Sequence, residues 1–325
     1  GAVLVYNDKI IGEGYHQKFG EAHAEVNAVQ AVKDKHLLKN ATLYVNLEPC
    51  SHHGNTPPCA EMIVKNKIPR VVIGTRDTSG KVSGKGIEIL KQGGCQVEEG
   101  VLEEECREVN KRFFTYQEKK RPYVILKWAQ TMDGFIDKLR KADDPIQPNW
   151  ITNKISKKVV HKWRAEEEAI LVGSVTTLKD NPQLTVREWK GKDPLRLVLD
   201  KNFDIDDSYT LVKDASRTVI FIDKNISRKK FNNKETNTEI KELDFSKNVI
   251  NQVLDYLYEN KISSLIVEGG SYTLNQFISE GLWDEARIFV GDKFFHEGVK
   301  APDVPKIKAK KVEFEETRLY ILRKI

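Results

Sequence analysis

The sequence predicts an α/β protein built from two domains. Strand-like and helix-like segments alternate along the chain, which is the pattern of helices packed on a largely parallel sheet. The alternation runs in two series, and the charged stretch 118–122 separates them as a linker that ends in proline. The length of 325 residues also favours two domains, since one domain averages about 150 residues. We place the first domain at residues 1–118 and the second at 121–325.

The first domain contains β-rich runs bounded by turn residues, and these are the expected strands: 2–6, 10–14, 42–47 and 70–75. The first two runs should form a hairpin. Apolar residues recur at helical spacing over 23–35. Pro57-Pro58 opens a second helix, because proline is tolerated in a first turn. The amphipathic run 102–118 predicts a single closing helix.

The second domain repeats this alternation with a larger set of elements. Its expected strands are β-rich runs at 123–127, 169–172, 195–199, 218–222, 264–267, 286–290 and 311–325. Its expected helices have apolar residues at helical spacing and cover 154–166, 247–259 and 272–280.

The composition excludes several classes of protein. Hydrophobic residues make up 39% and charged residues 31%, which is typical of a folded globular chain. No apolar run approaches the roughly 18 residues that a membrane-spanning helix needs. The formal charge is +5, and the basic residues are interspersed with acidic ones rather than gathered in a stripe. We therefore expect no membrane association and no nucleic-acid partner.

Cysteine usage and the start of the chain predict a cytoplasmic protein. Four cysteines are too few for a disulfide framework in a chain of this size, which favours a reducing compartment. The first residues lack the basic start and the small-residue cleavage site of a signal peptide. We further expect the chain to form a homo-oligomer.

One group of residues predicts a catalytic zinc (Zn2+) site. His23 and Glu25 lie at the start of one expected helix, and Cys50 and Cys59 lie around the start of the next. An imidazole and two thiolates suit a three-ligand zinc site whose fourth position stays open for water. Zinc would lower the pKa of that water to around 7. Glu25 is not a ligand in this arrangement and would carry protons to a leaving amine, as in zinc-dependent base deaminases.

The spacing of the two cysteines discriminates among deaminases. Deaminases of nucleic acids and free nucleosides usually close the site with Cys-x-x-Cys, whereas eight residues separate Cys50 from Cys59 here. A nucleic-acid or nucleotide deaminase, with the second domain as a non-catalytic binding module, is the alternative interpretation. Cys95 and Cys106 have no partner at ligand spacing, and we expect them to be small packing residues.

The second domain carries a weaker signal for phosphate binding. Gly269 and Gly270 follow a buried-type strand and precede a helix, which lets phosphate approach the backbone and the helix N-terminus. Arg164 and Arg187 flank a loop containing Gly and Thr, and guanidinium binds phosphate through two parallel hydrogen bonds. Taken alone, the glycines are also compatible with close packing and the arginines with a solvated surface. The turn is not a Gly-x-Gly-x-x-Gly fingerprint, so a Rossmann domain is not supported.

Two sets of motifs follow one another along the chain. The first set is Gly20-Glu21-Ala22-His23-Ala24-Glu25 and the run Leu47-Glu48-Pro49-Cys50 to Thr56-Pro57-Pro58-Cys59. The second set is Lys127, Met132-Asp133-Gly134, Trp150-Ile151-Thr152, Asp180-Asn181-Pro182 and Val267-Glu268-Gly269-Gly270. Together they resemble the bifunctional deaminase/reductase family of riboflavin biosynthesis. The resemblance implies a cytidine-deaminase-like zinc domain followed by a dihydrofolate-reductase-like α/β domain that uses NADPH.

The resemblance also implies two consecutive reactions on a small phosphoribosylaminopyrimidine. The first domain would deaminate 2,5-diamino-6-(5-phosphoribosylamino)pyrimidin-4-one, and the second would reduce the ribosyl group to ribityl. The residues that it implies for the cofactor are Ala129, Trp150, Thr176, Asp180, Gly270, Ser271, Tyr272, Thr273, Leu274, Asn275 and Gln276. Those that it implies for the substrate are Arg164, Leu184, Arg187 and Glu268.

The sequence departs from the family pattern in three places. Asn55 stands where the family usually has Arg or Lys. Pro148 stands where it usually has Ser, two residues before Trp150, and proline cannot donate a hydrogen bond. The helix and the asparagine that precede the first strand in the family are not in this sequence. We therefore expect a competent reductase and a weaker deaminase.

Overall fold

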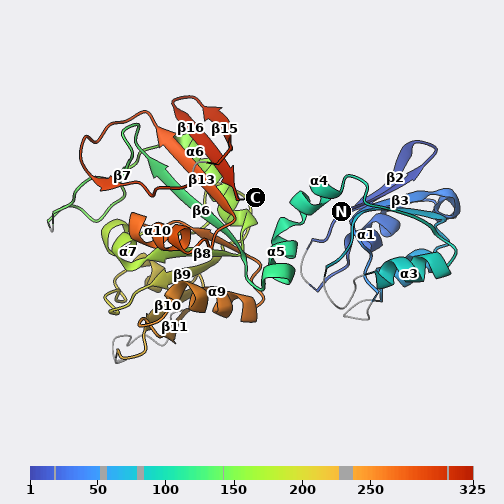
Figure 1. Ribbon diagram of the computed structural model, residues 1–325, viewed down its shortest axis with the longest axis horizontal. Coiled ribbons are helices and arrows are strands. Elements are labelled where there is room, and N and C mark those ends of the chain that lie inside the picture. Colours follow the sequence, from blue (N-terminus) through green and yellow to red (C-terminus); the bar gives the residue numbers. More distant parts are fainter. Residues whose placement is uncertain are drawn as a thin grey trace. The chain divides into compact units, whose positions relative to one another are not determined.

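The structure is a computed structural model that describes residues 1–17, 20–51, 57–78, 84–141, 143–226, 237–305 and 307–324. Packing divides the chain into two compact units, Gly1–Lys119 and Lys120–Ile325. Each unit has a mixed sheet with helices packed against it, which confirms the predicted α/β class (Figure 1). Within the described ranges, no helix is long and apolar enough to cross a membrane.

The first unit is built on a five-stranded sheet with the order β2-β1-β3-β4-β5. Its strands are β1 (Ala2–Tyr6), β2 (Lys9–Gly14), β3 (Thr42–Leu47), β4 (Arg70–Thr75) and β5 (Gln96–Glu99). The hairpin of β1 and β2 is antiparallel, and β1 also pairs antiparallel with β3. The remaining pairs, β3 with β4 and β4 with β5, are parallel. The carboxyl ends of β3 and β4 therefore meet at one edge of the sheet.

The helical segments of the first unit are α1 (Ala24–Ala31), η1 (Lys35–Asn40), α2 (Cys59–Lys65), α3 (Lys85–Gln92), α4 (Glu103–Val109) and α5 (Lys111–Lys119). Inward side chains such as Leu4, Leu43 and Ile73 pack with Ala28 of α1 and Ile63 of α2 in one buried core. Side chains alternate between the faces of a strand, so these residues mark the face that the first helices cover.

The expected helix over 102–118 is wrong in one respect, since the structure has two helices there. α4 ends at Val109 and α5 begins at Lys111. Asn110 between them has φ −100° and ψ 15°, and its Nδ2 donates a hydrogen bond to the Cys106 carbonyl at 2.8 Å. Asparagine competes in this way with the helical backbone and favours a break.

The second unit is built on a nine-stranded sheet with the order β11-β10-β9-β8-β12-β6-β13-β16-β15 (Figure 1). Its strands are β6 (Tyr123–Gln130), β8 (Ala169–Gly173), β9 (Leu195–Leu199), β10 (Thr218–Asp223), β11 (Thr238–Leu243), β12 (Ser264–Val267), β13 (Glu285–Gly291), β15 (Ala309–Phe314) and β16 (Thr317–Arg323). The pairs from β11 to β13 are parallel, and β16 pairs antiparallel with both β13 and β15. The β-rich run 311–325 is thus largely a hairpin rather than one strand.

The helices of the second unit are α6 (Lys154–Glu166), α7 (Ser174–Asp180), α8 (Thr210–Lys213), α9 (Val249–Glu259) and α10 (Ser271–Ser279). One core joins α9 and α10 to one face of the sheet, through residues such as Leu254, Phe277 and Leu171. A second core includes Trp163 of α6 and Ile170. Adjacent strand residues Ile170 and Leu171 belong to different cores, so both faces of the sheet are covered.

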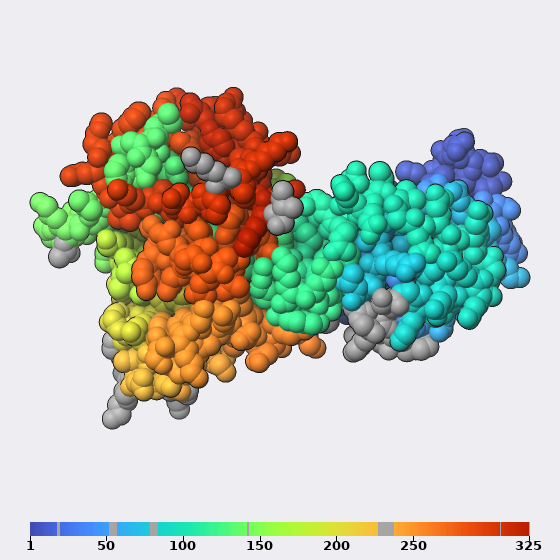
Figure 2. All heavy atoms as spheres, in the orientation of Figure 1, coloured from blue at the N-terminus to red at the C-terminus, as the bar shows by residue number. Residues whose placement is uncertain are grey.

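A short extra sheet pairs β7 (Phe135–Asp137) with β14 (Val299–Lys300). Figure 2 shows the corresponding green segment lying against the red C-terminal segments of the same unit. Sequence patterns did not predict this sheet, nor did they predict β5, β11, α3, α7 and α8.

Candidate active sites

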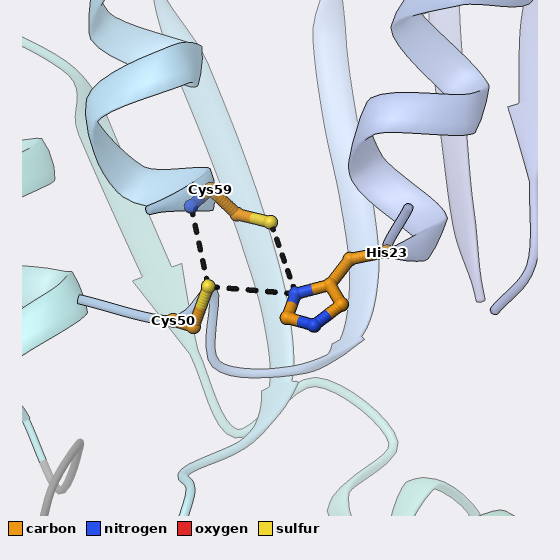
Figure 3. A group of neighbouring side chains, drawn as sticks. All are labelled: His23, Cys50 and Cys59. Atoms are coloured by element: carbon orange, nitrogen blue, oxygen red, sulfur yellow. Dashed lines mark hydrogen bonds between the residues drawn. The ribbon is translucent and has the colours of Figure 1, made fainter. Parts of the chain in front are cut away.

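Three potential metal ligands come together at the edge of the first sheet. His23 is the residue before α1, Cys50 lies in the loop after β3, and Cys59 is the first residue of α2. The side chains of His23, Cys50 and Cys59 point toward one another (Figure 3). Pro58 immediately precedes Cys59 and helps to begin α2 there, because its φ is already close to helical. The structure thus brings together the three ligands that the sequence predicts.

The distances between these ligand atoms fit a zinc ion. His23 Nδ1 lies 3.4 Å from the sulfur of Cys50 and 3.4 Å from the sulfur of Cys59. All three ligand atoms lie within 4.8 Å of one another. In a tetrahedral zinc site, bonds of about 2.3 Å to sulfur and about 2.0 Å to nitrogen place these atoms about 3.5 Å apart. The donor set and its spacing therefore suit Zn2+ with an open fourth position.

The surroundings of Cys50 favour its thiolate. Hydrogen bonds to the Cys59 and His23 side chains and from the Cys59 N–H lower the pKa of Cys50 to about 4. The hydrogen bond with Cys50 in turn raises the pKa of His23. A deprotonated sulfur is the form that binds metal, so the backbone of α2 already supports one ligand in its required state.

Glu25 lies beside the three ligands, in the first turn of α1. Its side chain is buried, and burial raises its pKa. The Glu25 carboxyl also contacts the Cys59 thiol. A buried carboxyl group beside the ligands is placed to take up and release a proton, which is what a general acid–base residue requires.

Glu48 supports the loop that carries Cys50, a role that sequence reasoning missed. Its buried carboxylate accepts backbone hydrogen bonds from Gly84 at 3.1 Å and from Gly86 at 3.0 Å. A Cβ on Gly86 would lie 2.0 Å from the carbonyl oxygen of Pro49. The start of α3 therefore approaches the Cys50 loop so closely that only glycine fits. The signal available in the sequence was a charged residue directly before Pro-Cys.

The second unit contains a cavity of about 950 Å³. It is lined by the carboxyl ends of parallel strands and by the starts of α7 and α10, where ligands bind in open α/β sheets. The predicted substrate residues Arg164, Leu184, Arg187 and Glu268 all line it. So do nine of the predicted cofactor residues: Ala129, Trp150, Thr176, Asp180, Gly270, Ser271, Tyr272, Thr273 and Gln276.

Two of the predicted cofactor residues do not line the cavity. Leu274 is fully buried and packs in the core beneath α10. Asn275 is exposed on α10, and its Nδ2 bonds to Ser271 Oγ at 3.2 Å. Helical periodicity explains both positions, because consecutive residues of one helix cannot all face the same ligand. The lining of the cavity therefore does not support cofactor contacts for the side chains of Leu274 and Asn275, and those two contacts stay predictions.

Glycines allow the starts of α7 and α10 to approach each other. A Cβ on Gly173 would lie 2.8 Å from Thr273 Oγ1, and one on Gly270 would lie 3.3 Å from Thr176 Oγ1. Free backbone N–H groups at helix N-termini bind phosphate. Two such ends beside each other fit the diphosphate of a dinucleotide such as NADPH.

A buried ion-pair cluster lies in the wall of this cavity. Arg164 donates two hydrogen bonds to Glu268, at 2.8 and 3.1 Å, and Lys127 Nζ lies 3.4 Å from the same carboxylate. Burial favours the neutral acid, but the charges of Arg164 and Lys127 prevail and lower the pKa of Glu268 to about 2. Burial also lowers the pKa of Lys127. Lys127 is thus part of the site, and its signal was a lysine within an otherwise apolar strand.

Arg140 forms an ion pair with the carboxylate of Asp180, one of the predicted cofactor residues. Its Nη2 donates to Asp180 Oδ1 at 2.7 Å, and its Nη1 donates to the carbonyls of Gln147 and Lys179 at 2.9 Å. These bonds attach the loop before Trp150 to the end of α7. Pro148 lines the cavity as well. Asn55, the other departure from the family pattern, lies outside the described residues.

Comparison with known proteins matches the two units to two different domain families. Residues 1–75 match the model of the cytidine and deoxycytidylate deaminase zinc-binding region, and residues 122–321 match that of the RibD C-terminal domain. The riboflavin biosynthesis protein RibD of Aquifex aeolicus is 41% identical over 322 residues, covering 96% of this chain and 88% of that protein. The Escherichia coli protein of the same name is 31% identical and covers 96% and 89%.

Solved structures give the same result. The crystal structure of a diaminohydroxyphosphoribosylaminopyrimidine deaminase/5-amino-6-(5-phosphoribosylamino)uracil reductase from Thermotoga maritima superposes with a TM-score of 0.85 at 38% identity. It covers 99% of this chain and 90% of that one. Fold and sites together define a bifunctional enzyme with a zinc-type deaminase centre and a reductase cavity. The chain belongs to the RibD family of riboflavin biosynthesis. This membership favours the deaminase/reductase interpretation over a nucleic-acid deaminase.

Proposed function

We propose that the two sites carry out consecutive reactions on one phosphoribosylaminopyrimidine. The first unit deaminates 2,5-diamino-6-(5-phosphoribosylamino)pyrimidin-4-one, and the second reduces the ribosyl group of the product to ribityl with NADPH. The observation that carries the proposal is the presence of both sites in one chain: the His23, Cys50 and Cys59 cluster and the cavity around Glu268. The T. maritima protein of similar structure carries the names of both activities.

In the first unit, His23, Cys50 and Cys59 hold the metal and Glu25 moves protons. Zinc, when bound, acidifies a water molecule at its open position. Glu25 contacts the ligand Cys59, and its carboxyl there would accept a proton and pass it to the departing amine. Hydrolysis then exchanges the amine for a carbonyl oxygen, with ammonia as the other product.

In the second unit, the chain positions two ligands and supplies charge. The α7 and α10 starts bind the cofactor diphosphate, and Arg187 binds the substrate phosphate. NADPH, when bound, supplies a hydride for the anomeric carbon of the opened sugar. Glu268 is ionised and accepts hydrogen bonds from substrate N–H or O–H groups. Lys127 would donate a proton to a sugar oxygen, because burial lowers the pKa of its ammonium.

Variants at the two sites test the proposal. Glu25→Gln keeps the shape of the side chain but cannot shuttle protons, so deamination should fall by ~10²–10⁴-fold while zinc stays bound. Gly270→Val should obstruct the cofactor cradle and weaken NADPH binding while deamination continues. Each variant should still perform the other half-reaction. Loss of both activities in a folded Gly270→Val protein would overturn the two-domain assignment.

We further infer a cytoplasmic homo-oligomer that binds no nucleic acid. The cysteines in the described ranges form no disulfide, which suits a reducing compartment. Basic and acidic residues are interspersed along the chain, which does not favour a nucleic-acid surface. Light scattering on the purified protein tests the oligomeric state, and an RNA mobility shift that weakens with salt would contradict the last point.

A further inference from the structure

One face of α6 holds the segment that carries Arg187. Lys157, His161 and Arg164 are spaced at i, i+4 and i+7, so their side chains leave the helix on the same side. Each of the three contacts a different residue of the segment 185–188, which we call the Arg187 segment. This segment has no regular secondary structure, and its residue Arg187 lines the cavity.

The two outer contacts fix the ends of the Arg187 segment. Arg164 Nη1 donates to the Thr185 carbonyl at 3.4 Å. Lys157 Nζ pairs with Glu188 Oε1 at 2.8 Å. Both side chains of the second pair are about one-third exposed, so this ion pair contributes little by itself.

The central contact is different because it is buried and directed at the main chain. The Arg187 N–H donates to His161 Nδ1 at 3.1 Å, and the His161 side chain is only 1% exposed. An imidazole that accepts at Nδ1 is neutral and carries its proton on Nε2. Burial and the charges of Arg164 and Arg187 lower the pKa of His161 to about 4, so the ring keeps this acceptor at neutral pH.

Arg187 itself is exposed toward the cavity and oriented by its neighbour. Its Nη1 donates to Thr185 Oγ1 at 2.7 Å. A guanidinium has five N–H donors, so a single such bond sets the plane of the group and leaves donors for a phosphate. The direction in which those donors point depends on where the main chain of Arg187 is held.

We propose that His161 is a positioning residue, which fixes the main chain of Arg187 so that its guanidinium meets the phosphate of the substrate. The inference rests on the proposed function, in which Arg187 binds that phosphate. His161 also lines the cavity but bonds to protein rather than to the reacting atoms, so it should affect binding of the phosphorylated substrate and not the chemical step.

Three substitutions of His161 separate positioning from a general effect on folding. His161→Leu removes the acceptor. His161→Gln keeps a polar side chain but moves its oxygen toward the place of Nε2. His161→Asn places its amide oxygen close to the place of Nδ1 and should restore the bond. Should the Leu variant fail to fold, the Gln and Asn pair gives the same comparison.

The measurement is KM and kcat for the reductase step, with the phosphorylated substrate and with its dephosphorylated counterpart. Loss of one hydrogen bond should raise KM for the phosphorylated substrate roughly five- to tenfold in the Leu and Gln variants, with kcat within about twofold. KM for the dephosphorylated compound should not change. The Asn variant should match the wild type for both compounds, a result that loss of structure alone would not produce.

The pH dependence gives a second readout. The charged groups around His161 are Arg164 and Lys157 on its own helix, Arg187 and Glu188 on the facing segment, and Glu268. Since His161 stays neutral above pH 5, KM for the phosphorylated substrate should show no inflection from a histidine between pH 6 and 8. An inflection there that disappears in the Asn variant would overturn the proposal.

The variant Arg187→Met separates failure of the positioning role of His161 from failure of the proposed function of Arg187. If this variant loses the preference for the phosphorylated substrate and His161→Leu and His161→Gln do not, the positioning role is wrong and the proposed role of Arg187 stands. If Arg187→Met leaves the preference intact, the phosphate contact in the proposed function is wrong. If both Arg187→Met and His161→Leu lose it and the double variant is no worse than Arg187→Met alone, the coupling is as proposed.

Discussion

The two sites differ in whether neighbouring side chains balance the charge of their buried groups. In the first unit, His23, Cys50 and Cys59 converge, and no Lys or Arg pairs with them or with Glu25 in the part of the chain that the structure describes. In the second unit, the buried carboxylate of Glu268 already has two cations, Arg164 at 2.8 Å and Lys127 at 3.4 Å. The first site requires an added cation to neutralise its thiolates, whereas the second is compensated by its own side chains.

This difference indicates where each site obtains its shape. Metal binding is coupled to the state of its ligands, so the first site should depend on zinc for its order as well as for its chemistry. Ion pairs within the second site hold the cavity wall before any ligand binds. Removing one residue of the ion-pair cluster should therefore destabilise the second unit, whereas removing one metal ligand should mainly abolish the activity of the first unit.

The largest expected effect is the loss of a metal ligand. Cys59→Ala should abolish zinc binding and lower deamination ~10³-fold or more, because two protein ligands do not hold a catalytic zinc. NADPH-dependent reduction should stay within about twofold. Zinc analysis and assays of each half-reaction on the same preparation measure both. Cys95→Ala is the matched control, since Cys95 is a buried free thiol whose Sγ donates to the Ile68 carbonyl at 3.2 Å.

The second-largest expected effect is the loss of the Glu268 carboxylate in the second unit. Glu268→Gln leaves Arg164 and Lys127 buried without their carboxylate, which should lower the free energy of unfolding of the second unit by about 3–5 kcal/mol. Denaturant unfolding followed by fluorescence provides the measurement. Glu239→Gln is the control, because its ion pair with Arg217 is exposed and should contribute at most ~0.5 kcal/mol. Equal stability losses in the two variants would contradict the account.

The second unit should also show a pH dependence of stability that comes from His161. The pKa of His161 is about 4 when folded and 6.5 in its ordinary state, so the unfolded chain binds more protons between those values. Stability is therefore full above pH 6.5 and falls as the pH drops toward 4, by up to about 3 kcal/mol. His161→Asn should flatten this slope. A slope in the variant as steep as in the wild type would rule out His161 as its source.

The smallest expected effect concerns the close approach of Gly86 to the loop that carries Cys50. Gly86→Ala places a methyl group 2.0 Å from the Pro49 carbonyl, so the loop must shift and Cys50 with it. Zinc affinity should fall roughly 10–100-fold, as for other losses of support around metal ligands. Competition with a chromogenic chelator measures this, and wild-type affinity would show that the loop adapts without cost.

Sequence patterns predicted the metal site more completely than the cavity. His23, Glu25, Cys50 and Cys59 are few, chemically distinctive residues at helix starts, so local signals locate them. The cavity is assembled from the ends of many strands, and its residues resemble ordinary surface or core residues until the sheet brings them together. His161 and Arg140 were missed for this reason, since each acts through a bond to the backbone or a carboxylate distant in sequence. Glu48, beside the metal site, was also missed, because its carboxylate acts through backbone N–H groups about 36–38 residues further along the chain.

The fold shows the same contrast. Strands with strong apolar character, such as β9 and β12, were predicted to the residue. β11 was missed because Thr238–Leu243 has three charged residues and only two apolar ones, as an edge strand can. α7 was missed because Ser174–Asp180 is rich in Ser and Thr, which favour helices weakly. Its helical state depends on packing against β8 and β9, a tertiary effect that a local pattern does not contain.

The claim that one chain holds two separate chemistries is tested most directly by removing and restoring zinc. We expect chelated protein to lose deamination of the diaminopyrimidine and to keep NADPH-dependent reduction of the deaminated compound. Addition of Zn2+ should restore the first activity and leave the second unchanged. Retention of deamination without zinc, or loss of both activities together, would contradict the account.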